Sequence, residues 1–282
     1  MKIIQLHNST PSQMMGMVII TNNGNIIAID GGTKGDKGEF KRIIGENGDK
    51  IDLWLLTHPH ADHQGIFVDM NETHDKDIEV KKVCYSPAAD DYVTTDIPMH
   101  AADLGIIKKT MENPIYPVQI LKKGDVFTVD NVRVEVLRVV NPSLNPCSIN
   151  DLSVVYSISE MDKDKTCFKL IILGDLYVPG GNELLELYKD IPETIKADAV
   201  QMAHHGQNGV SREVYEAINA KYAFWPTPDW LWTNTLKKDE PGQGPWKTLV
   251  VRKWMEEMNV QPITALEHHV MFDTQNMSVT TL

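Results

Sequence analysis

The chain has 282 residues, of which 42% are hydrophobic and 23% are charged, an ordinary composition for a globular protein. Its formal net charge of -12 argues against a broad basic surface for nucleic-acid backbones, although metal ions could still grip a phosphate locally. No apolar stretch approaches the roughly 20 residues of a membrane span, and three scattered cysteines do not make a disulfide framework, so we expect a cytoplasmic protein with no membrane partner.

Short strand-like runs alternate with turns in the first third of the chain. Residues 2–6, 17–21 and 25–29 are typical of strands, with an Asn-Asn-Gly turn at 22–24, and residues 40–44 fit a short amphipathic helix. The run IDLWLL at 51–56 is continuously apolar, as in a strand buried on both faces. A helix is predicted over 63–74 and another strand over 78–85.

The rest of the chain continues the same alternation. Residues 86–116 look helical and irregular and predict a surface insertion, while 125–140 alternate as in a half-buried hairpin. Strands are predicted at 153–159, 167–173, 198–203, 263–268 and 277–282, and helices near 181–190, 211–220 and 246–258. Two β-rich halves with interspersed helices indicate an α/β protein with two packed sheets covered by helices, in one domain over 1–282.

The sequence THPHADH at 57–63 holds four metal-ligand side chains: His58, His60, Asp62 and His63. Histidines two residues apart do not share a helix face, so we expect the cluster on a loop after the strand 51–56. Imidazole and carboxylate are the ligands that zinc and related ions favour. The alternative is a polar loop whose histidines are unrelated.

Two further buried runs end in residues of the same kind. KLIILGDL ends near Asp175, and the run ADAVQMA is followed by His204, His205 and a glycine. Taken alone, Asp175 would more often cap a helix, and the histidine pair could equally serve packing. Together with the cluster, they predict a site built where strands end at one sheet edge.

These stretches, LLTHPHADHQG, IILGDL and MAHHGQNG in this order, resemble the metallo-β-lactamase superfamily. The resemblance extends from Met1 to about Gly209 and implies an αββα four-layer sandwich, with two mixed β-sheets flanked by helices and a dinuclear metal site at one edge. IIAIDGG resembles an early motif of this family whose aspartate, here Asp30, supports the site without binding metal.

The resemblance also implies a division of the ligands. His58 and His60 would bind the first metal, Asp62 and His63 the second, and Asp175 would bridge them. His205 would complete the second metal, which leaves His204 free to contact the substrate or its leaving group. The implied cofactors are two divalent ions, with Zn²⁺ as first choice and Mn²⁺ or Fe as alternatives.

One part of the family pattern is absent. The family usually places a third histidine for the first metal before the Gly-Asp motif, but this interval holds only His74 and His100, both early and in the predicted insertion. The segment NDLS at 150–153 resembles an Asn-x-x-Ser version found in DNA-uptake competence proteins and phosphorylcholine esterases. Asn150 or water would then take the place, Asn145, Cys147 and Asp151 remain open, and the first-metal site is predicted to be weak or partly occupied.

The resemblance implies hydrolysis by a metal-activated water, and the chain has no G-x-S-x-G nucleophile motif. β-Lactamase members commonly carry cysteine where Asp175 stands, so antibiotic hydrolysis is disfavoured and a small-molecule or other phosphoester substrate is favoured, especially a phosphodiester. His204 and Asn150 are the candidate catalytic residues. The alternatives are an ester, thioester or lactone hydrolase, and a metal-stabilised binding or regulatory protein; the oligomeric state is not predicted.

An aromatic and proline-rich loop is predicted near 222–246, with Trp225, Trp230, Trp232 and Trp246. It could pack against the body of the protein. It could also form a pocket wall whose aromatic rings stack on a base or enclose a quaternary ammonium group.

Overall fold

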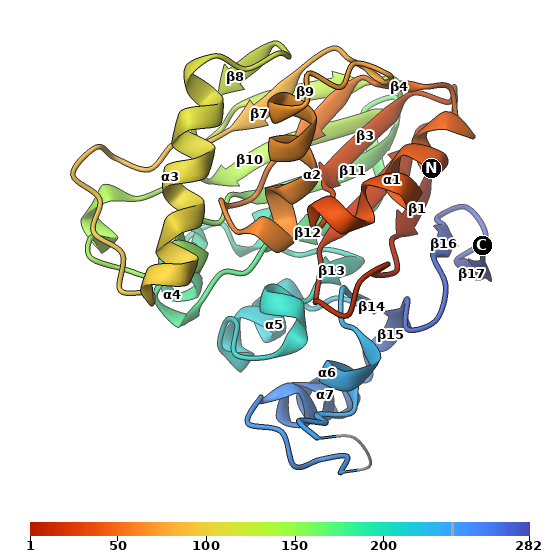
Figure 1. The fold of residues 1–282 in the computed structure, drawn as a ribbon. Helices are drawn as coiled ribbons and strands as arrows, with labels where there is room; N and C mark the ends of the chain where they lie inside the picture. Colours follow the sequence, from red (N-terminus) through yellow and green to blue (C-terminus); the bar gives the residue numbers. More distant parts are fainter. Residues whose placement is uncertain (238–239) are drawn as a thin grey trace.

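The computed structural model describes residues 1–237 and 240–282 and contains two large β-sheets packed face to face (Figure 1). The first has the order β17-β16-β1-β2-β3-β5-β7-β8, with bounds β1 Lys2–Gln5, β2 Gly16–Ile20, β3 Ile26–Asp30, β5 Leu53–Leu55, β7 Val83–Tyr85, β8 Val118–Ile120, β16 Val270–Asp273 and β17 Ser278–Thr281. The second has the order β15-β14-β13-β12-β11-β10-β9, with bounds β9 Val126–Val129, β10 Val132–Arg138, β11 Val155–Asp162, β12 Lys165–Ile172, β13 Ala199–Gln201, β14 Tyr222–Trp225 and β15 Gln261–Thr264.

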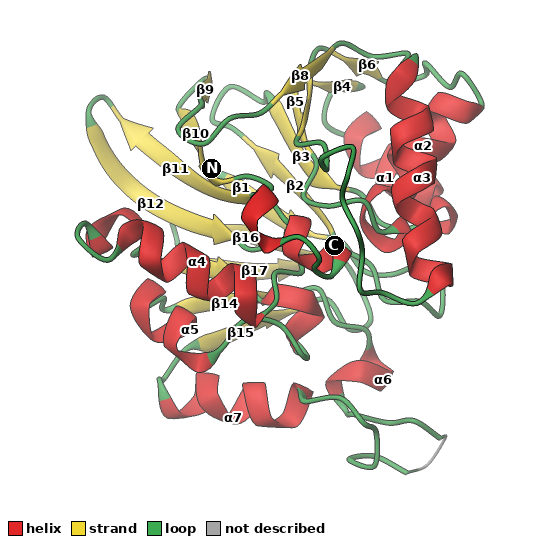
Figure 2. Ribbon diagram, turned by 90° about the vertical axis from the view of Figure 1, so that its left-hand side faces the viewer, coloured by secondary structure: helices red, strands yellow, loops and turns green. Residues whose placement is uncertain are grey.

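Helices cover the outer face of each sheet (Figure 2). The first sheet carries α1 Lys37–Gly45, α2 Ala61–Glu72 and α3 Pro98–Glu112, and the second carries α4 Val178–Tyr188, α5 Arg212–Ile218 and α7 Thr248–Glu257. Shorter elements are α6 Asp229–Trp232 and the 3-10 turns η1 Lys34–Asp36, η2 Pro142–Leu144, η3 Ile149–Leu152, η4 Pro192–Thr194 and η5 Ala203–Gly206. The predicted αββα sandwich of two mixed sheets is confirmed.

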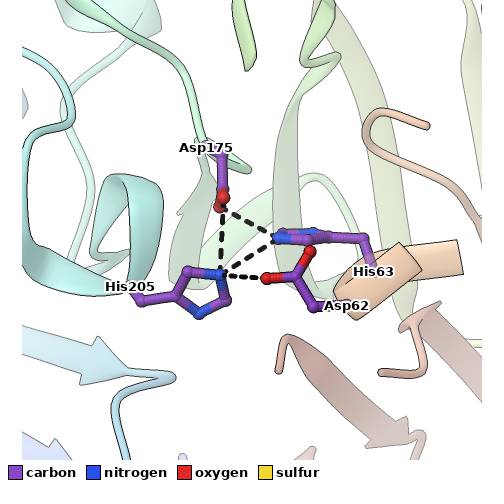
Figure 3. Close-up of side chains that lie close together, drawn as sticks. All are labelled: Asp62, His63, Asp175 and His205. Carbon is purple, nitrogen blue, oxygen red and sulfur yellow. Dashed lines mark hydrogen bonds and ion pairs between the residues drawn. The ribbon is translucent and has the colours of Figure 1, made fainter. Parts of the chain in front are cut away.

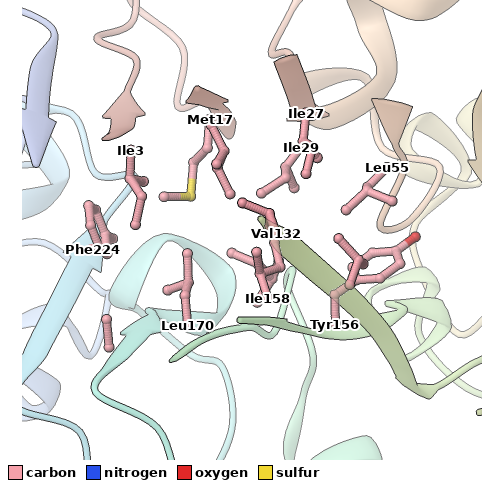
Figure 4. Close-up of a cluster of buried hydrophobic side chains, with 14 of the residues drawn as sticks. Ile3, Met17, Ile27, Ile29, Leu55, Val132, Tyr156, Ile158, Leu170 and Phe224 are labelled. Atoms are coloured by element: carbon pink, nitrogen blue, oxygen red, sulfur yellow. The ribbon is translucent and has the colours of Figure 1, made fainter. Parts of the chain in front are cut away.

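The core between the sheets is built by the alternation of side chains along each strand. Ile27 and Ile29 of β3 point inward toward the other sheet, whereas Ala28 points outward to the helices (Figure 4). The predicted alternation of Val132, Val134 and Val136 places all three valines in this same inner layer. Strands with apolar residues on both faces are expected only where each face is covered, as it is here.

The apolar run at 51–56 is not one strand, as predicted, but two. Lys50–Ile51 (β4) pairs with Glu79–Val80 (β6) in a small separate sheet, and β5 joins the large sheet between β3 and β7. The interruption is Asp52, whose carboxylate accepts the Ile26 N–H at 3.1 Å and the Lys81 ammonium at 2.6 Å. Periodicity alone did not reveal this polar break.

The segment predicted as an insertion contains α3 and irregular chain on either side of it, and its origin as an insertion stays a prediction. The aromatic segment at 222–246 contains β14 and α6, and its residues 238 and 239 lie outside the described residues. In the described part of the chain, no helix is both long and apolar enough to cross a bilayer.

Parallel pairing determines where the polar residues meet. β3 runs parallel to β5, and β12 runs parallel to β13, so the carboxyl ends of each pair lie at one edge of their sheet. Asp30, Thr57, Asp175 and Met202 stand at or just after those ends. Stacking the two sheets brings both edges together and creates the site described next.

Candidate metal centre

The histidine cluster is divided between a loop and a helix. His58 and His60 lie on the loop after β5, but α2 begins at Ala61, so Asp62 and His63 belong to its first turn. The prediction of a loop for all four residues was therefore wrong for two of them. The spacing argument applied only to His58 and His60, and a carboxylate such as Asp62 is favoured at a helix N-terminus by the dipole of the backbone.

Asp175 is held at the turn after β12 by close backbone packing. Its N–H donates to Ser153 Oγ at 3.0 Å, and Gln201 Oε1 accepts the N–H groups of both Leu173 and Gly174. Gly174 has φ +57°, and a Cβ there would lie 2.8 Å from Ser153 Oγ. Only glycine fits such a turn without strain, and it directs the Asp175 carboxylate toward the histidines.

The His-His-Gly sequence forms a turn in which three successive residues have positive φ. His204 and His205 have φ values of 50° and 54°, a sparsely populated region for residues with a side chain. Gly206 follows with φ +76°, and a Cβ at this position would lie 2.3 Å from the Trp225 ring. The indole of Trp225 thus packs directly against the turn and helps to hold His205 in the site.

Four side chains form one group of candidate ligands: Asp62, His63, Asp175 and His205 (Figure 3). His63 Nε2 lies 3.0 Å from Asp175 Oδ1 and 3.4 Å from His205 Nε2. His205 Nε2 lies 3.2 Å from Asp62 Oδ2 and 3.4 Å from Asp175 Oδ2. Ligand atoms about 2.0–2.2 Å from a tetrahedral ion are about 3.3–3.6 Å apart, so these separations are close to those around a divalent metal ion.

His58, His60 and Asp175 form a second group. His58 Nε2 lies 3.1 Å from His60 Nδ1 and 3.9 Å from Asp175 Oδ2. Among the described residues, Asp175 is the member that both groups share. Its carboxylate is buried, and neither oxygen has a hydrogen-bond partner within the described part of the chain, although four imidazole nitrogens, those of His58, His63, His204 and His205, lie within 4 Å. Such atoms are ready to bind a cation.

The Nδ1 atoms of His63 and His205 form hydrogen bonds with groups that belong to neither ligand group. His63 Nδ1 lies 2.7 Å from the Asp30 carboxylate, and His205 Nδ1 lies 2.7 Å from the Pro226 carbonyl. Asp30 also accepts the Thr57 N–H at 2.8 Å and the Thr57 hydroxyl at 2.6 Å. These partners hold the proton on Nδ1 of both histidines and leave each Nε2 lone pair for a metal ion.

Burial lowers the pKa values of these histidines, whereas the neighbouring carboxylates raise them. Burial by itself lowers the pKa of His205, but the carboxylates of Asp175 and Asp62 outweigh it and raise that pKa to about 9. Burial is likewise outweighed at His63, whose pKa is raised well above its usual value by Asp175 and Asp30. At His58, burial and the neighbouring His63 lower the pKa well below its usual value. Three carboxylates in a buried pocket require positive charge, which a metal ion supplies.

Comparison with known proteins agrees with this geometry. The model of the metallo-beta-lactamase superfamily matches residues 16–151 of the chain, and the αββα architecture extends over the whole of it. Residues 16–151 are thus similar to this superfamily, and the chain has the metallo-beta-lactamase fold. The superfamily includes metal-dependent hydrolases, and the two ligand groups form the candidate active site. No curated protein sequence matches the chain.

Solved structures share the fold at low sequence identity. The metallo-beta-lactamase fold protein YhfI from Bacillus subtilis has a TM-score of 0.53 and 11% identity, covering 93% of this chain and 95% of that chain. A long form RNase Z from yeast has a TM-score of 0.55 and 11% identity, covering 99% of this chain and 49% of that one. A variant of the β-hydroxylase CmlA has a TM-score of 0.55 and 12% identity, covering 100% and 54%. Identities this low show the fold alone.

A cavity of about 590 Å³, called the metal cavity below, opens over the candidate metal centre. Asn150, Tyr177 and His204 line it, together with His60 and Asp62. Asn150 Oδ1 and His204 Nδ1 are buried without a hydrogen-bond partner among the residues described. Burial lowers the pKa of His204 to about 4 and raises that of Tyr177 to about 12, so a neutral imidazole and a protonated phenol face the cavity.

The structure narrows the candidates for the place of the absent third histidine. Asn145 binds the backbone of Asp91 and Val93, Cys147 contacts the Tyr92 hydroxyl at 3.7 Å, and the Asp151 carboxylate accepts the Gly180 N–H at 3.0 Å. All three are engaged outside the centre. Asn150 is the candidate whose side chain lies at the cavity.

His74 and His100, which the sequence analysis did not take as the third ligand of the first metal, have different surroundings in the structure. His74 is exposed in the turn after α2, away from the ligands. The ring of His100 on α3 lies 5.5 Å from that of His60, between centroids, and His100 lines the metal cavity. His100 belongs to neither ligand group among the described residues, so leaving it out as a ligand stays a prediction. Its place on the cavity wall was not predicted, and it arises because α3 folds back over the loop that carries His60.

The four tryptophans divide between the two predicted roles. Trp225 and Trp232 pack edge to face at 5.2 Å, with Trp225 buried in the core. Trp230 and Trp246 lie 4.9 Å apart and line the metal cavity. Neither interpretation of the segment was complete by itself.

Sequence reasoning missed two other residues of the site. Gln13 donates to Asp62 Oδ2 at 3.0 Å and accepts from Gln207 Nε2 at 3.0 Å, from a loop that no motif distinguishes. Tyr177 lies two residues after Asp175, with its ring 5.0 Å from that of His204. Its place beside the Gly-Asp motif was a usable signal, whereas Gln13 gave none.

Proposed function

We propose that this protein hydrolyses phosphoesters, most specifically a phosphodiester, with two divalent metal ions, Zn²⁺ as first choice. The observation that carries the proposal is that Asp175 belongs to both ligand groups, with imidazole nitrogens 3.0–3.9 Å from its two oxygens. When bound, the ions would supply an activated water and a positive clamp for the oxygens of the attacked group. The yeast RNase Z, a ribonuclease by name, has the same fold and is consistent with this substrate class.

The residues around the candidate metal centre would bind the substrate and orient its leaving group. Asp175 and His205 lie on turns after strands of the second sheet, whereas His58 follows β5 of the first sheet and His63 lies on α2, so the substrate would lie where the two sheets meet. The neutral imidazole of His204 stands on the cavity wall, where its N–H would donate to the leaving oxygen. The amide of Asn150 would hold a non-reacting oxygen of the same group.

A substrate panel tests the proposal. Purified protein with added Zn²⁺ or Mn²⁺ should hydrolyse bis-p-nitrophenyl phosphate faster than p-nitrophenyl acetate, a thioester or a lactone. Asp175→Ala should lower this activity at least about 100-fold, because removing even a residue that supports a ligand costs 10–100-fold. His74→Ala is the matched control, since His74 is exposed outside the cavity, and it should leave activity unchanged.

Two results would contradict the proposal. Faster turnover of a carboxylic ester, thioester or lactone would reassign the substrate class while keeping the metal chemistry. Metal binding without turnover of any substrate in the panel would instead make the chain a metal-stabilised binding or regulatory protein.

A further inference from the structure

A second hollow adjoins the metal cavity on the far side of His60. It has a volume of about 380 Å³ and lies between α2 and α3, lined among others by Gln64, Val68, Glu72 and Ile106. We call it the α2–α3 groove. Four residues line both hollows, namely Thr33, His60, Ala61 and Asp103, so the two spaces meet along one wall.

One face of α3 follows this continuous cleft. Met99 lines the metal cavity, Asp103 lines both spaces and Ile106 lines the groove, at the four- and three-residue spacing of a single helix face. Met99 and Ile106 remain 70% and 43% exposed, although they are large and apolar. Seven residues of helix span about 10 Å, so the cleft extends well beyond the metal ligands.

Gln64 lines the groove with a side-chain amide that has no hydrogen-bond partner among the described residues. The residue is 2% exposed, and both its amide nitrogen and its amide oxygen lack a hydrogen-bond partner in the described part of the chain. Buried polar side chains are nearly always paired, and a primary amide that is unpaired at both ends is unusual. A group that offers one acceptor and one donor side by side would pair both ends at once.

The charges around the groove limit what such a group can be. Asp69, Glu72 and Asp103 line it, against one lysine, Lys34. An excess of carboxylates disfavours an anion, and Val68 and Ile106 offer apolar surface to a carbon framework. A cation such as an ammonium or guanidinium group has donors alone and would leave the Gln64 amide nitrogen unpaired. A neutral group with an amide-type edge on an apolar body meets all of these conditions.

We infer that the α2–α3 groove is a second binding subsite, in which Gln64 recognises the N–H and C=O edge of a neutral amide, either an open carboxamide or a cyclic lactam. This inference rests on the proposed function only in taking the amide to be the distal part of an elongated phosphoester substrate. The ester would lie at the metal centre, and the amide would lie along α3 beyond His60.

Binding of small probes tests the subsite without any turnover. Benzamide, 2-pyridone and acetophenone are titrated into zinc-loaded protein and followed by saturation-transfer NMR. Benzamide or 2-pyridone should bind more tightly than acetophenone, which lacks the N–H, and the preferred one of the two identifies an open or a cyclic amide. Gln64→Leu should weaken amide binding about tenfold, because two hydrogen bonds are lost, and leave acetophenone unaffected.

A second variant keeps the test decisive if Gln64→Leu does not fold. Ile106 is partly exposed, so Ile106→Glu should fold and fill the groove with a carboxylate, weakening amide binding at least tenfold. Ile120→Glu is its control, since Ile120 is 54% exposed and lines neither hollow. Equal binding of acetophenone and both amides, or no change in either groove variant, overturns the inference.

Kinetics separate this inference from the proposed function. For a phosphodiester whose alcohol carries a carboxamide, Gln64→Leu should raise KM about tenfold with kcat unchanged, while bis-p-nitrophenyl phosphate is unaffected. Hydrolysis with no effect of Gln64 rejects the subsite alone. Amide binding that Gln64 controls, without hydrolysis of any phosphoester, rejects the proposed function alone.

Discussion

Replacing Asp30 by asparagine should weaken metal binding although Asp30 is not a ligand. Asp30 is completely buried, and its Oδ2 accepts from both His63 Nδ1 and the Thr57 hydroxyl, while Oδ1 accepts the Thr57 N–H. Asparagine has the same shape but turns one of these acceptors into a donor. In either orientation of the amide, at least one donor then faces another donor.

The magnitude follows from the bonds that are lost. The contact to His63 is a hydrogen bond to a charged group, which contributes about 1.5–3 kcal/mol. It also fixes the tautomer and ring orientation of His63, and losing such a partner typically costs 10–100-fold in metal affinity. We therefore expect the site with His63 to lose about 1.4–2.7 kcal/mol of binding free energy, and the site with His58 and His60 to lose less.

Competition with a zinc chelator, combined with thermal unfolding, measures both effects. Asp36→Asn is the matched control: Asp36 is 1% exposed and accepts the N–H groups of Ser9 and Thr33 and the Thr33 hydroxyl, without touching a ligand. Both variants should lower the unfolding temperature, but only Asp30→Asn should lower the affinity for zinc. Unchanged affinity in Asp30→Asn would refute the role given to Asp30.

Three further outcomes are expected. In the metal-free protein His205 is protonated at neutral pH, because its pKa is raised to about 9. Zinc binding should therefore release protons, and the zinc affinity should fall about tenfold per released proton for each unit by which the pH is lowered. Calorimetry in buffers of different ionisation enthalpy measures the proton release, and its absence would contradict this prediction. Gly206→Ala should destabilise the fold by about 2–4 kcal/mol and weaken zinc binding, whereas Gly38→Ala, in open space on α1, should be neutral or stabilising in the same denaturant titration. Arg138→Met should cost about 3–5 kcal/mol in that titration, because Arg138 is 1% exposed and its loss leaves the half-buried Glu183 and the buried carbonyls of Asp151 and Ser153 without their donor. A similar loss for Arg133→Met, whose pair with Glu135 is more exposed, would contradict this reasoning.

The candidate ligands that the structure brings together could be selected from the sequence because each follows a buried strand and has an unusual side chain for that place. Asp175 and His205 are far apart in the chain, yet both end apolar runs, and parallel pairing of β12 and β13 puts such ends together. The break at Asp52 could not be found in this way, because a single carboxylate in an apolar run has the same local pattern whether or not a backbone N–H from β3 reaches it.

The cavity walls could not be read from the sequence, since they depend on how separate elements approach one another. His100 lies on a helix that follows an irregular segment, and nothing local indicates that α3 returns to within 5.5 Å of His60. Gln13 reaches Asp62 from an ordinary loop. The local sequence pattern identifies the candidate metal ligands, whereas tertiary packing decides which other side chains line the cavity around them.

The metal centre also has a mechanical consequence that follows from its two sources. His58 and His63 are carried by the first sheet and α2, while Asp175 and His205 are carried by turns of the second sheet. A cation bound by both sets connects the two sheets at one edge, where imidazoles and carboxylates would otherwise keep the apolar layers apart. Because the unfolded chain has no such arrangement, the affinity for a bound metal ion would add to the free energy of unfolding, and the sandwich and the candidate metal centre would stabilise each other.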